Sequence, residues 1–197
     1  MATIKNCDIS ENDLKQIHII AFISNKLINS GEKADLHKVF KIIYFADEKH
    51  LKIAGRTISG DRFKAMDNGP VPSNSYDILK GVRGDGQSYF SRFKDFFNIE
   101  DNQNIIPKIQ ADLDEFSDSD IEILQESINE NQHLSYRELR KKSHDKAWSS
   151  AKNNSYDKMI HPVLMAKESG AKDEVIKYIK NYEEDKEFAS FIASCGI

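Results

Sequence analysis

The chain has 197 residues, of which 39% are hydrophobic and 30% charged, and its formal net charge is −4 at pH 7. This apolar content suffices for a hydrophobic core and excludes a disordered chain. The acidic balance disfavours a general nucleic-acid binder, because such proteins are usually basic. A chain of this length is expected to form one domain, and we predict that residues 1–197 do so.

Neither a secretory signal nor a membrane span is expected from the sequence. Residues 1–10 lack the apolar stretch of a signal peptide, and no apolar run approaches the ~20 residues of a membrane-spanning helix. We therefore expect a cytoplasmic protein without a membrane span. The two cysteines, Cys7 and Cys195, fit reduced thiols in that compartment, although a single bridge between the two ends stays open. No Cys/His cluster has the spacing of a zinc site, so neither a metal nor a cofactor is expected.

Two helices are predicted before residue 55. The first covers about residues 12–29, because Ser10 offers N-cap chemistry, apolar residues recur at helical spacing and Gly31 follows. The second begins after Asp35 and ends before Gly55. Its apolar residues occupy most sides of the helix, which is typical of a buried central helix.

The stretch Gly69-Pro70-Val71-Pro72 follows a loop bracketed by glycines that has room for one short strand. Proline fixes its own φ and holds the preceding residue in extended geometry, so the stretch predicts a rigid turn. Pro72 suits the first position of the next helix, where a missing N–H costs nothing. That helix is expected to continue to about Gly81.

The second half of the chain also reads as mainly helical. A mobile glycine-rich segment and then a small hairpin are expected between residues 81 and 110, and the hairpin must pack on helices to be stable. Capping patterns at Ser117 and Ser135 predict two further helices, and the last helix covers about 171–187. We expect a mainly α fold, a single compact helical domain with a small accessory β-hairpin.

No catalytic motif is present. The chain lacks a nucleophile-elbow sequence, a metalloprotease motif, a phosphate-binding loop and a dinucleotide fingerprint. The cysteines have no evident histidine partner, so we expect no enzymatic activity.

Basic residues gather in one short segment. They form either a solvated helix face or a patch for an acidic partner or nucleic acid, and the pattern loosely suggests a helix-turn-helix. The members of this basic patch are Arg137, Arg140, Lys141, Lys142 and Lys146.

Two linked motifs resemble the SocA-like, or Panacea, antitoxin domain family, whose pattern reads KLLYFAD…HL, then G…I.GD.F.A…GPVP…YD.L. The matching residues are Ile43, Tyr44, Phe45, Ala46, Asp47, His50, Leu51, Gly55, Gly60, Asp61, Phe63, Ala65, Gly69, Pro70, Val71, Pro72, Tyr76, Asp77 and Leu79. The second motif matches at Ser135, Leu139, Ser143, His144, Trp148 and Ala151. The departures are mild: KIIYF replaces KLLYF, and Ser143 stands where members often have Thr. The resemblance covers about residues 14–152 and leaves a C-terminal helical extension at about 153–197.

The resemblance implies an antitoxin that neutralises a cognate toxin, encoded beside it, through direct protein–protein binding. One branch of the family instead acts as an adaptor that delivers its toxin to a Clp protease, and a nucleic-acid-binding regulator is a further alternative. Some members carry an extra DNA-binding domain, which we do not expect here because the match begins near residue 14. The oligomeric state stays open, and a homo-oligomer is one possibility.

The two motifs also suggest a surface for the partner. Tyr44, Phe45 and Trp148 are expected in the core, and His144 is expected to cap or hydrogen-bond inside the fold. The sharper hypothesis makes the rigid turn a preordered edge for a partner, because preorganisation lowers the ordering cost of association. Its candidate residues are Asp61, Arg62, Asp67, Asn68, Gly69, Pro70, Val71 and Pro72, with His144 and Trp148 as a minority addition. The apolar tail 188–197 either docks on a partner or packs back on the domain.

Overall fold

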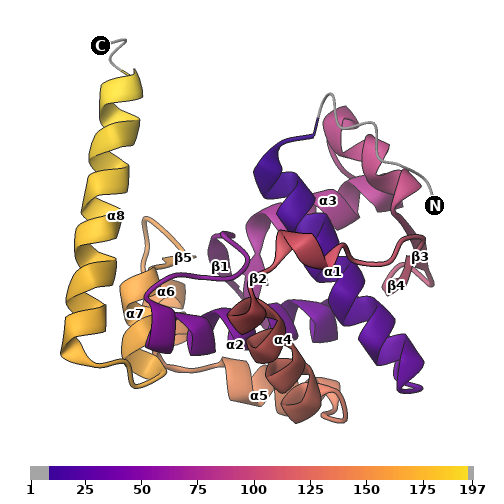
Figure 1. Ribbon diagram of the computed structural model, residues 1–197, viewed down its shortest axis with the longest axis horizontal. Coiled ribbons are helices and arrows are strands. Elements are labelled where there is room, and N and C mark those ends of the chain that lie inside the picture. Colours follow the sequence, from indigo (N-terminus) through magenta and orange to yellow (C-terminus); the bar gives the residue numbers. More distant parts are fainter. Residues whose placement is uncertain (1–8, 195–197) are drawn as a thin grey trace.

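The computed structural model describes residues 9–194, and Cys7 and Cys195 lie outside the described residues. Helices make up most of the fold and two small sheets complete it, so the predicted mainly α class is confirmed (Figure 1). None of the described helices is both long enough and apolar enough to span a membrane.

The two N-terminal helices form where their caps predict them. Helix α1 (Glu11–Asn29) begins behind Ser10, whose side chain accepts the backbone N–H of Asp13. Helix α2 (Leu36–Ala54) begins behind Asp35, which accepts the N–H of Lys38, and ends at Gly55 in the left-handed region. An unbroken run from Lys38 to Asp47 is buried, and α2 crosses the middle of the molecule (Figure 1). The prediction of a central core helix is confirmed.

A three-stranded antiparallel sheet lies beside α2, in the order β2-β1-β5. Its strands are β1 (Phe63–Met66), β2 (Gly69–Pro72) and β5 (Met159–Ile160), and Phe63 pairs with both Pro72 and Ile160. The prediction of a turn over Gly69–Pro72 is wrong, because these residues form strand β2 and the turn is Asp67–Asn68. Two prolines are tolerated there because β2 is an edge strand, where a missing N–H breaks few ladder bonds.

The other strands form the small hairpin that the sequence predicts. Strands β3 (Phe97–Glu100) and β4 (Asn104–Pro107) pair in antiparallel register, and Asp101 and Asn102 take the positive φ of the tight turn. An isolated bridge between Asp35 and Asn104 ties the hairpin to the start of α2.

Short helices complete the body. In chain order they are α3 (Ser73–Arg83), η1 (Ser88–Asp95), η2 (Leu113–Glu115), α4 (Asp118–Asn131), α5 (Tyr136–Ser143), α6 (Lys146–Lys152) and α7 (Pro162–Glu168). Both predicted capping patterns are present as capping boxes, at Ser117 and at Ser135. The segment predicted to be mobile, residues 81–90, instead includes the end of α3 and the start of η1. This 3-10 helix packs on α3, with the Phe90 side chain against Gly81.

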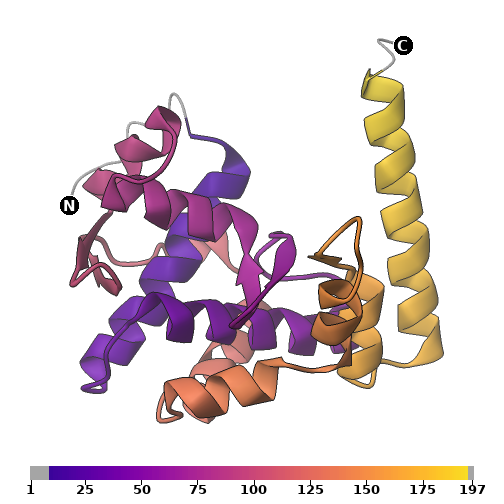
Figure 2. The same cartoon turned by 180° about the vertical axis from the view of Figure 1, so that it is seen from behind.

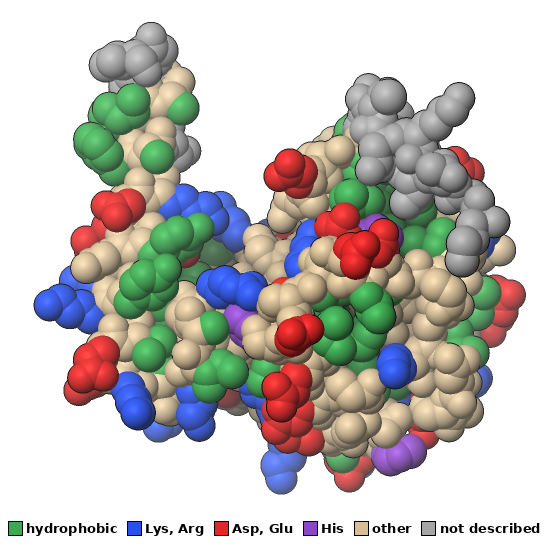
Figure 3. Space-filling view, viewed as in Figure 1, with side chains coloured by type: hydrophobic (Ala, Val, Ile, Leu, Met, Phe, Trp, Pro, Cys, Tyr) green, Lys and Arg blue, Asp and Glu red, His purple; other side chains and the backbone are tan. Residues whose placement is uncertain are grey.

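Helix α8 (Asp173–Ser194) stands apart from this body, as the two opposite views agree (Figures 1 and 2). Its first turns pack on α7 and α2, where Ile179 is buried and Tyr178 lies against Gly55. The rest projects outward, and Figure 3 shows hydrophobic side chains on it. This helix continues to the last described residue, beyond the 171–187 range that the sequence predicts.

Candidate functional site

Side chains from three helices hold the β1–β2 turn by its backbone. Three backbone carbonyls in a row accept hydrogen bonds: that of Met66 from Trp148 Nε1 (3.0 Å), that of Asp67 from Arg140 Nη2 (3.3 Å) and that of Asn68 from His37 Nε2 (3.3 Å). In strand β2, the Pro70 carbonyl accepts from Lys41 Nζ at 2.7 Å. We call these four donors, Trp148, Arg140, His37 and Lys41, the clasp. The clasp satisfies carbonyls that would otherwise need water and so fixes the position of the turn.

Lys41 lies beneath the turn and is the buried member of the clasp. Its side chain is almost fully inaccessible, and no ion pair joins it to a carboxylate of the described residues. Burial lowers the pKa of Lys41 from 10.5 to about 7, because the charged form loses its hydration. The hydrogen bond to the Pro70 carbonyl is therefore what replaces the lost hydration of the Lys41 ammonium.

Gly69 is required at the point where the turn meets Lys41. Its φ is 103°, a region that side chains with a Cβ rarely adopt. A Cβ there would lie 2.6 Å from Ser143 Oγ and 2.9 Å from Lys41 Nζ. The family motif thus has a glycine where both the backbone conformation and the available space exclude other residues.

Two ring pairs line the sides of the turn, one stacked and one tilted. The His144 ring lies over Trp148 with centroids 3.7 Å apart, and the His37 ring lies against Tyr136 at 4.0 Å. Burial lowers the pKa of His37 to about 4 and also lowers that of His144. The nearby basic side chains add to both shifts, so the neutral form of each ring is favoured.

The predicted partner-binding residues divide between interior and surface. Gly69, Pro70 and Pro72 are buried, Val71 is half-buried, and His144 and Trp148 are half-buried parts of the turn's support. Arg62, Asp67 and Asn68 are exposed, and the Asp67 carboxylate pairs with Lys152.

The assignment of Asp61 to a polar rim needs correction. Asp61 is buried, and its carboxylate accepts the backbone N–H groups of Arg62, Asn74 and Ser75, together with the Ser75 hydroxyl. It caps α3, for which Pro72 provides no side-chain cap. Both carboxylate oxygens of Asp61 therefore accept hydrogen bonds from within the fold.

Asp47 has a similar internal function. This fully buried carboxylate accepts the N–H groups of Ile58 (2.7 Å) and Ser59 (3.0 Å) and the Ser59 hydroxyl. Burial raises its pKa to about 7 in spite of these hydrogen bonds. Asp47 thus fixes the loop that leads from α2 into β1.

Several side chains are exposed on the clasped turn and on helix α5, which holds it through Arg140. Met66 is 44% exposed and Tyr136 is 51% exposed, while Arg137 and Arg140 are exposed on α5. We call these four residues, with Asp67 and Asn68, the turn rim. Sequence reasoning named Asp67 and Asn68 but missed Met66 and Tyr136 as exposed residues, and it missed Lys41 and His37 as clasp residues. A lysine inside the apolar run KIIYF was the one signal for Lys41.

The predicted basic patch does not form one continuous free surface. Arg140 donates to the turn, whereas Lys142 donates to Asn131, lies 3.8 Å from Glu130 and covers the Phe45 ring. The other three residues, Arg137, Lys141 and Lys146, are exposed.

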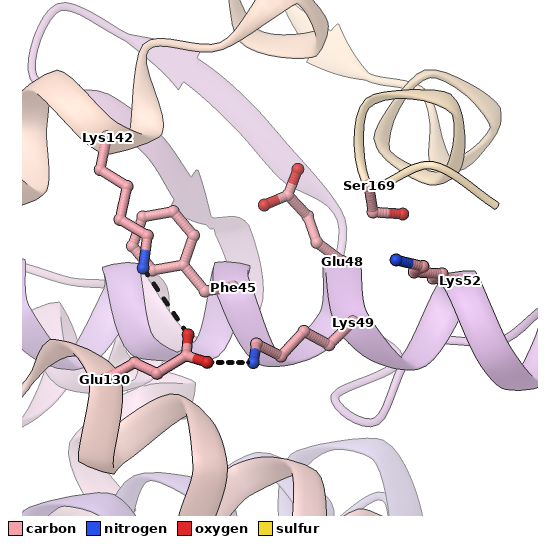
Figure 4. A pocket seen from close by; sticks show the side chains of 7 residues that line it. All are labelled: Phe45, Glu48, Lys49, Lys52, Glu130, Lys142 and Ser169. Carbon is pink, nitrogen blue, oxygen red and sulfur yellow. Dashed lines mark hydrogen bonds and ion pairs between the residues drawn. The ribbon is translucent and has the colours of Figure 1, made fainter.

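A hollow of about 280 Å³ lies beside Phe45 on α2 (Figure 4). Glu130 forms ion pairs there with Lys49 at 2.6 Å and with Lys142 at 3.8 Å. Two of the lysines that line the hollow are therefore already paired with a carboxylate. Burial raises the pKa of Glu48 to about 9, and the nearby Asp145 carboxylate adds to this rise. Within residues 9–194 no His, Cys, Asp or Glu cluster could hold a metal ion.

Comparison with known families adds one finding. A family model described as "Antitoxin SocA-like, Panacea domain" matches residues 39–149, more than half of the chain. The matched segment runs from α2 to α6 and includes Lys41, Arg140, Trp148 and the whole β1–β2 turn. No curated protein and no solved structure matches the chain significantly.

Proposed function

The chain belongs to the family of SocA-like antitoxins with a Panacea domain, and from this membership we propose that it neutralises a cognate toxin by binding it directly. The toxin would be a protein encoded beside it, and the complex would cover the surface through which the toxin acts. The clasped turn is the observation that supports direct binding most strongly.

The turn is suited to recognition because its backbone is already fixed. Three successive carbonyls and that of Pro70 are satisfied by side chains of the same chain, so a partner would not have to order them. Preorganisation of this kind lowers the entropic cost of association.

The turn rim also has a composition that favours protein contacts. Met, Tyr and Arg are enriched at protein interfaces, and Met66, Tyr136, Arg137 and Arg140 are exposed around one turn. A stable complex needs roughly 1,200–2,000 Å² of total buried surface, so the turn rim would form the centre of a larger interface.

The first experiment is a growth assay with the adjacent gene. The neighbouring reading frame is expressed alone and with this chain, in hosts with and without Clp protease. We expect toxicity that the chain relieves in both hosts, together with a stable complex of the two purified proteins. Relief only in the host with the protease would instead indicate an adaptor. A neighbour that is not toxic and does not bind would contradict the antitoxin proposal.

Variants of the turn rim test the surface itself. We expect Met66→Glu combined with Arg137→Glu to weaken toxin binding at least about tenfold, because Met66 is exposed next to the turn and Arg137 is exposed on α5, the helix that holds the turn through Arg140. Tyr156→Ala is the matched control, since Tyr156 is fully exposed and belongs to neither the clasp nor the turn rim. Unchanged affinity in a folded double variant would move the interface elsewhere.

A further inference from the structure

Helix α8 exposes more large aromatic side chains than it buries. Tyr178 is 57% exposed, Tyr182 51%, Phe188 66% and Phe191 62%. The Tyr178 ring lies against Gly55 of the body and stacks on the Tyr182 ring, whereas Phe188 and Phe191 lie near the C-terminal end of the helix. Large apolar side chains gathered on one element usually mark an interaction site.

The aromatic residues lie on more than one side of the helix. An α-helix turns by roughly 100° per residue, so Phe188 is about 120° around the axis from Tyr182. Phe188 and Phe191 are about 60° apart and form one face with Ile192. A flat partner surface would cover only one of these sides, whereas a groove could enclose both.

Acidic residues separate the two aromatic pairs. Glu183, Glu184, Asp185 and Glu187 lie between Tyr182 and Phe188, with Lys186 as the one basic residue among them. All four carboxylates are on the helix part that leaves the body.

This charge pattern opposes pairing between two copies of α8. Full antiparallel overlap of Asp173–Ser194 would place Glu183 and Glu184 of both copies at the twofold axis. Lys180 of each copy would face Glu187 of the other, which offsets only part of the excess negative charge of residues 180–187. Parallel pairing would place the same acidic run against itself. Like charges that face each other across a helix pair are destabilising, so a partner of opposite charge fits this surface better than a second copy.

We infer that α8 is a docking arm whose distal part, residues 182–194, binds an apolar groove rimmed by Lys and Arg on a partner protein. This mode resembles the insertion of amphipathic helices into hydrophobic grooves. The inference rests on the proposed function in taking the toxin as that partner. Because α8 lies outside the matched residues 39–149, its contact would add to that of the turn rim.

The experiment measures binding of the full chain to the purified product of the adjacent gene, at about 50 mM and about 300 mM salt. We expect Phe188→Ser combined with Phe191→Ser to weaken binding at least about tenfold. We expect Glu183→Lys combined with Glu184→Lys to slow association at low salt by a similar factor, and high salt to reduce that difference. Lys177→Ala combined with Lys180→Ala, on the first half of the same helix, should not weaken binding.

The outcomes distinguish a failure of this inference from a failure of the proposed function. If the wild type neutralises the toxin and the phenylalanine variant binds equally well, the arm has no such function while the antitoxin proposal stands. If the wild type forms no complex, both fall. If the full chain is a dimer in light scattering and the phenylalanine variant is a monomer, a second copy covers the arm and the inference is wrong. Circular dichroism of each variant confirms that it is folded.

Discussion

Lys41 shows how one buried side chain can link two motifs. It comes from the KIIYF run of α2, and its ammonium donates to Pro70 in the GPVP strand. Burial lowers its pKa to about 7, so that near neutral pH the folded protein holds it only partly charged. The unfolded chain returns Lys41 to its ordinary pKa, which makes the residue a source of pH-dependent stability.

Lys41→Met should therefore change how stability depends on pH. Between about pH 7 and 10.5 the unfolded chain binds a proton that the folded chain has released, so the Lys41 contribution to unfolding free energy rises with pH. Its slope is at most about 1.4 kcal/mol per pH unit, and it is absent in the variant. Denaturant unfolding of both proteins between pH 7 and 10 measures the difference.

The difference between the two curves isolates Lys41. Glu48, whose pKa is raised to about 9, acts with opposite sign because unfolding releases its proton, but it contributes to both proteins. Lys177→Met, at an exposed position of α8, is the control and should leave the slope unchanged. Parallel curves for wild type and Lys41→Met would show that the buried ammonium stays protonated.

At the scale of elements, Asp61 connects the end of a loop to the start of α3. Asp61→Ala should destabilise the protein by about 2–4 kcal/mol, because it leaves the buried N–H of Ser75 and the half-buried N–H of Asn74 without their acceptor. Ser135→Ala, which removes the exposed capping box of α5, should cost only about 1 kcal/mol. Chemical denaturation measures both losses. A stable Asp61→Ala variant that loses toxin binding would return Asp61 to the partner surface.

The elements that the sequence predicts well are those with local signals. The caps at Ser10, Asp35, Ser117 and Ser135 placed helices where the structure has them, because a cap acts on N–H groups two or three residues away. Strand β2 was missed because prolines disfavour strands, and only pairing with β1 and an edge position make one possible.

The candidate site was predictable only in part for the same reason. Both motifs were recognised from the sequence, and Trp148 and Asn68 were among the named residues. Their connection through the carbonyls of Met66 and Asn68 depends on contacts between distant segments. Strand β5 likewise has two residues and exists only by pairing with β1. Periodicity and spacing contain no information on such pairing.

For the whole molecule, the body and the arm differ in what they contribute to stability. A chain that ends at Tyr182 keeps Val175, Ile176, Tyr178 and Ile179, which pack on the body. We expect its melting temperature to stay within about 2–4 °C of the full chain, because the removed side chains that the structure describes are largely exposed. Scanning calorimetry makes the comparison, and a larger decrease would mean that the arm packs on the body.

The clasp determines when, during synthesis, the β1–β2 turn can reach its final conformation. Trp148 and Met66 are 82 residues apart in the chain, and Arg140 and Asp67 are 73 apart. Such contacts close long loops, which raises the contact order and slows folding. During synthesis, strands β1 and β2 leave the ribosome well before Arg140 and Trp148 have been translated. The turn can be fixed only after translation has passed Trp148, so any partner that recognises the fixed turn binds a chain whose α6 has already been made.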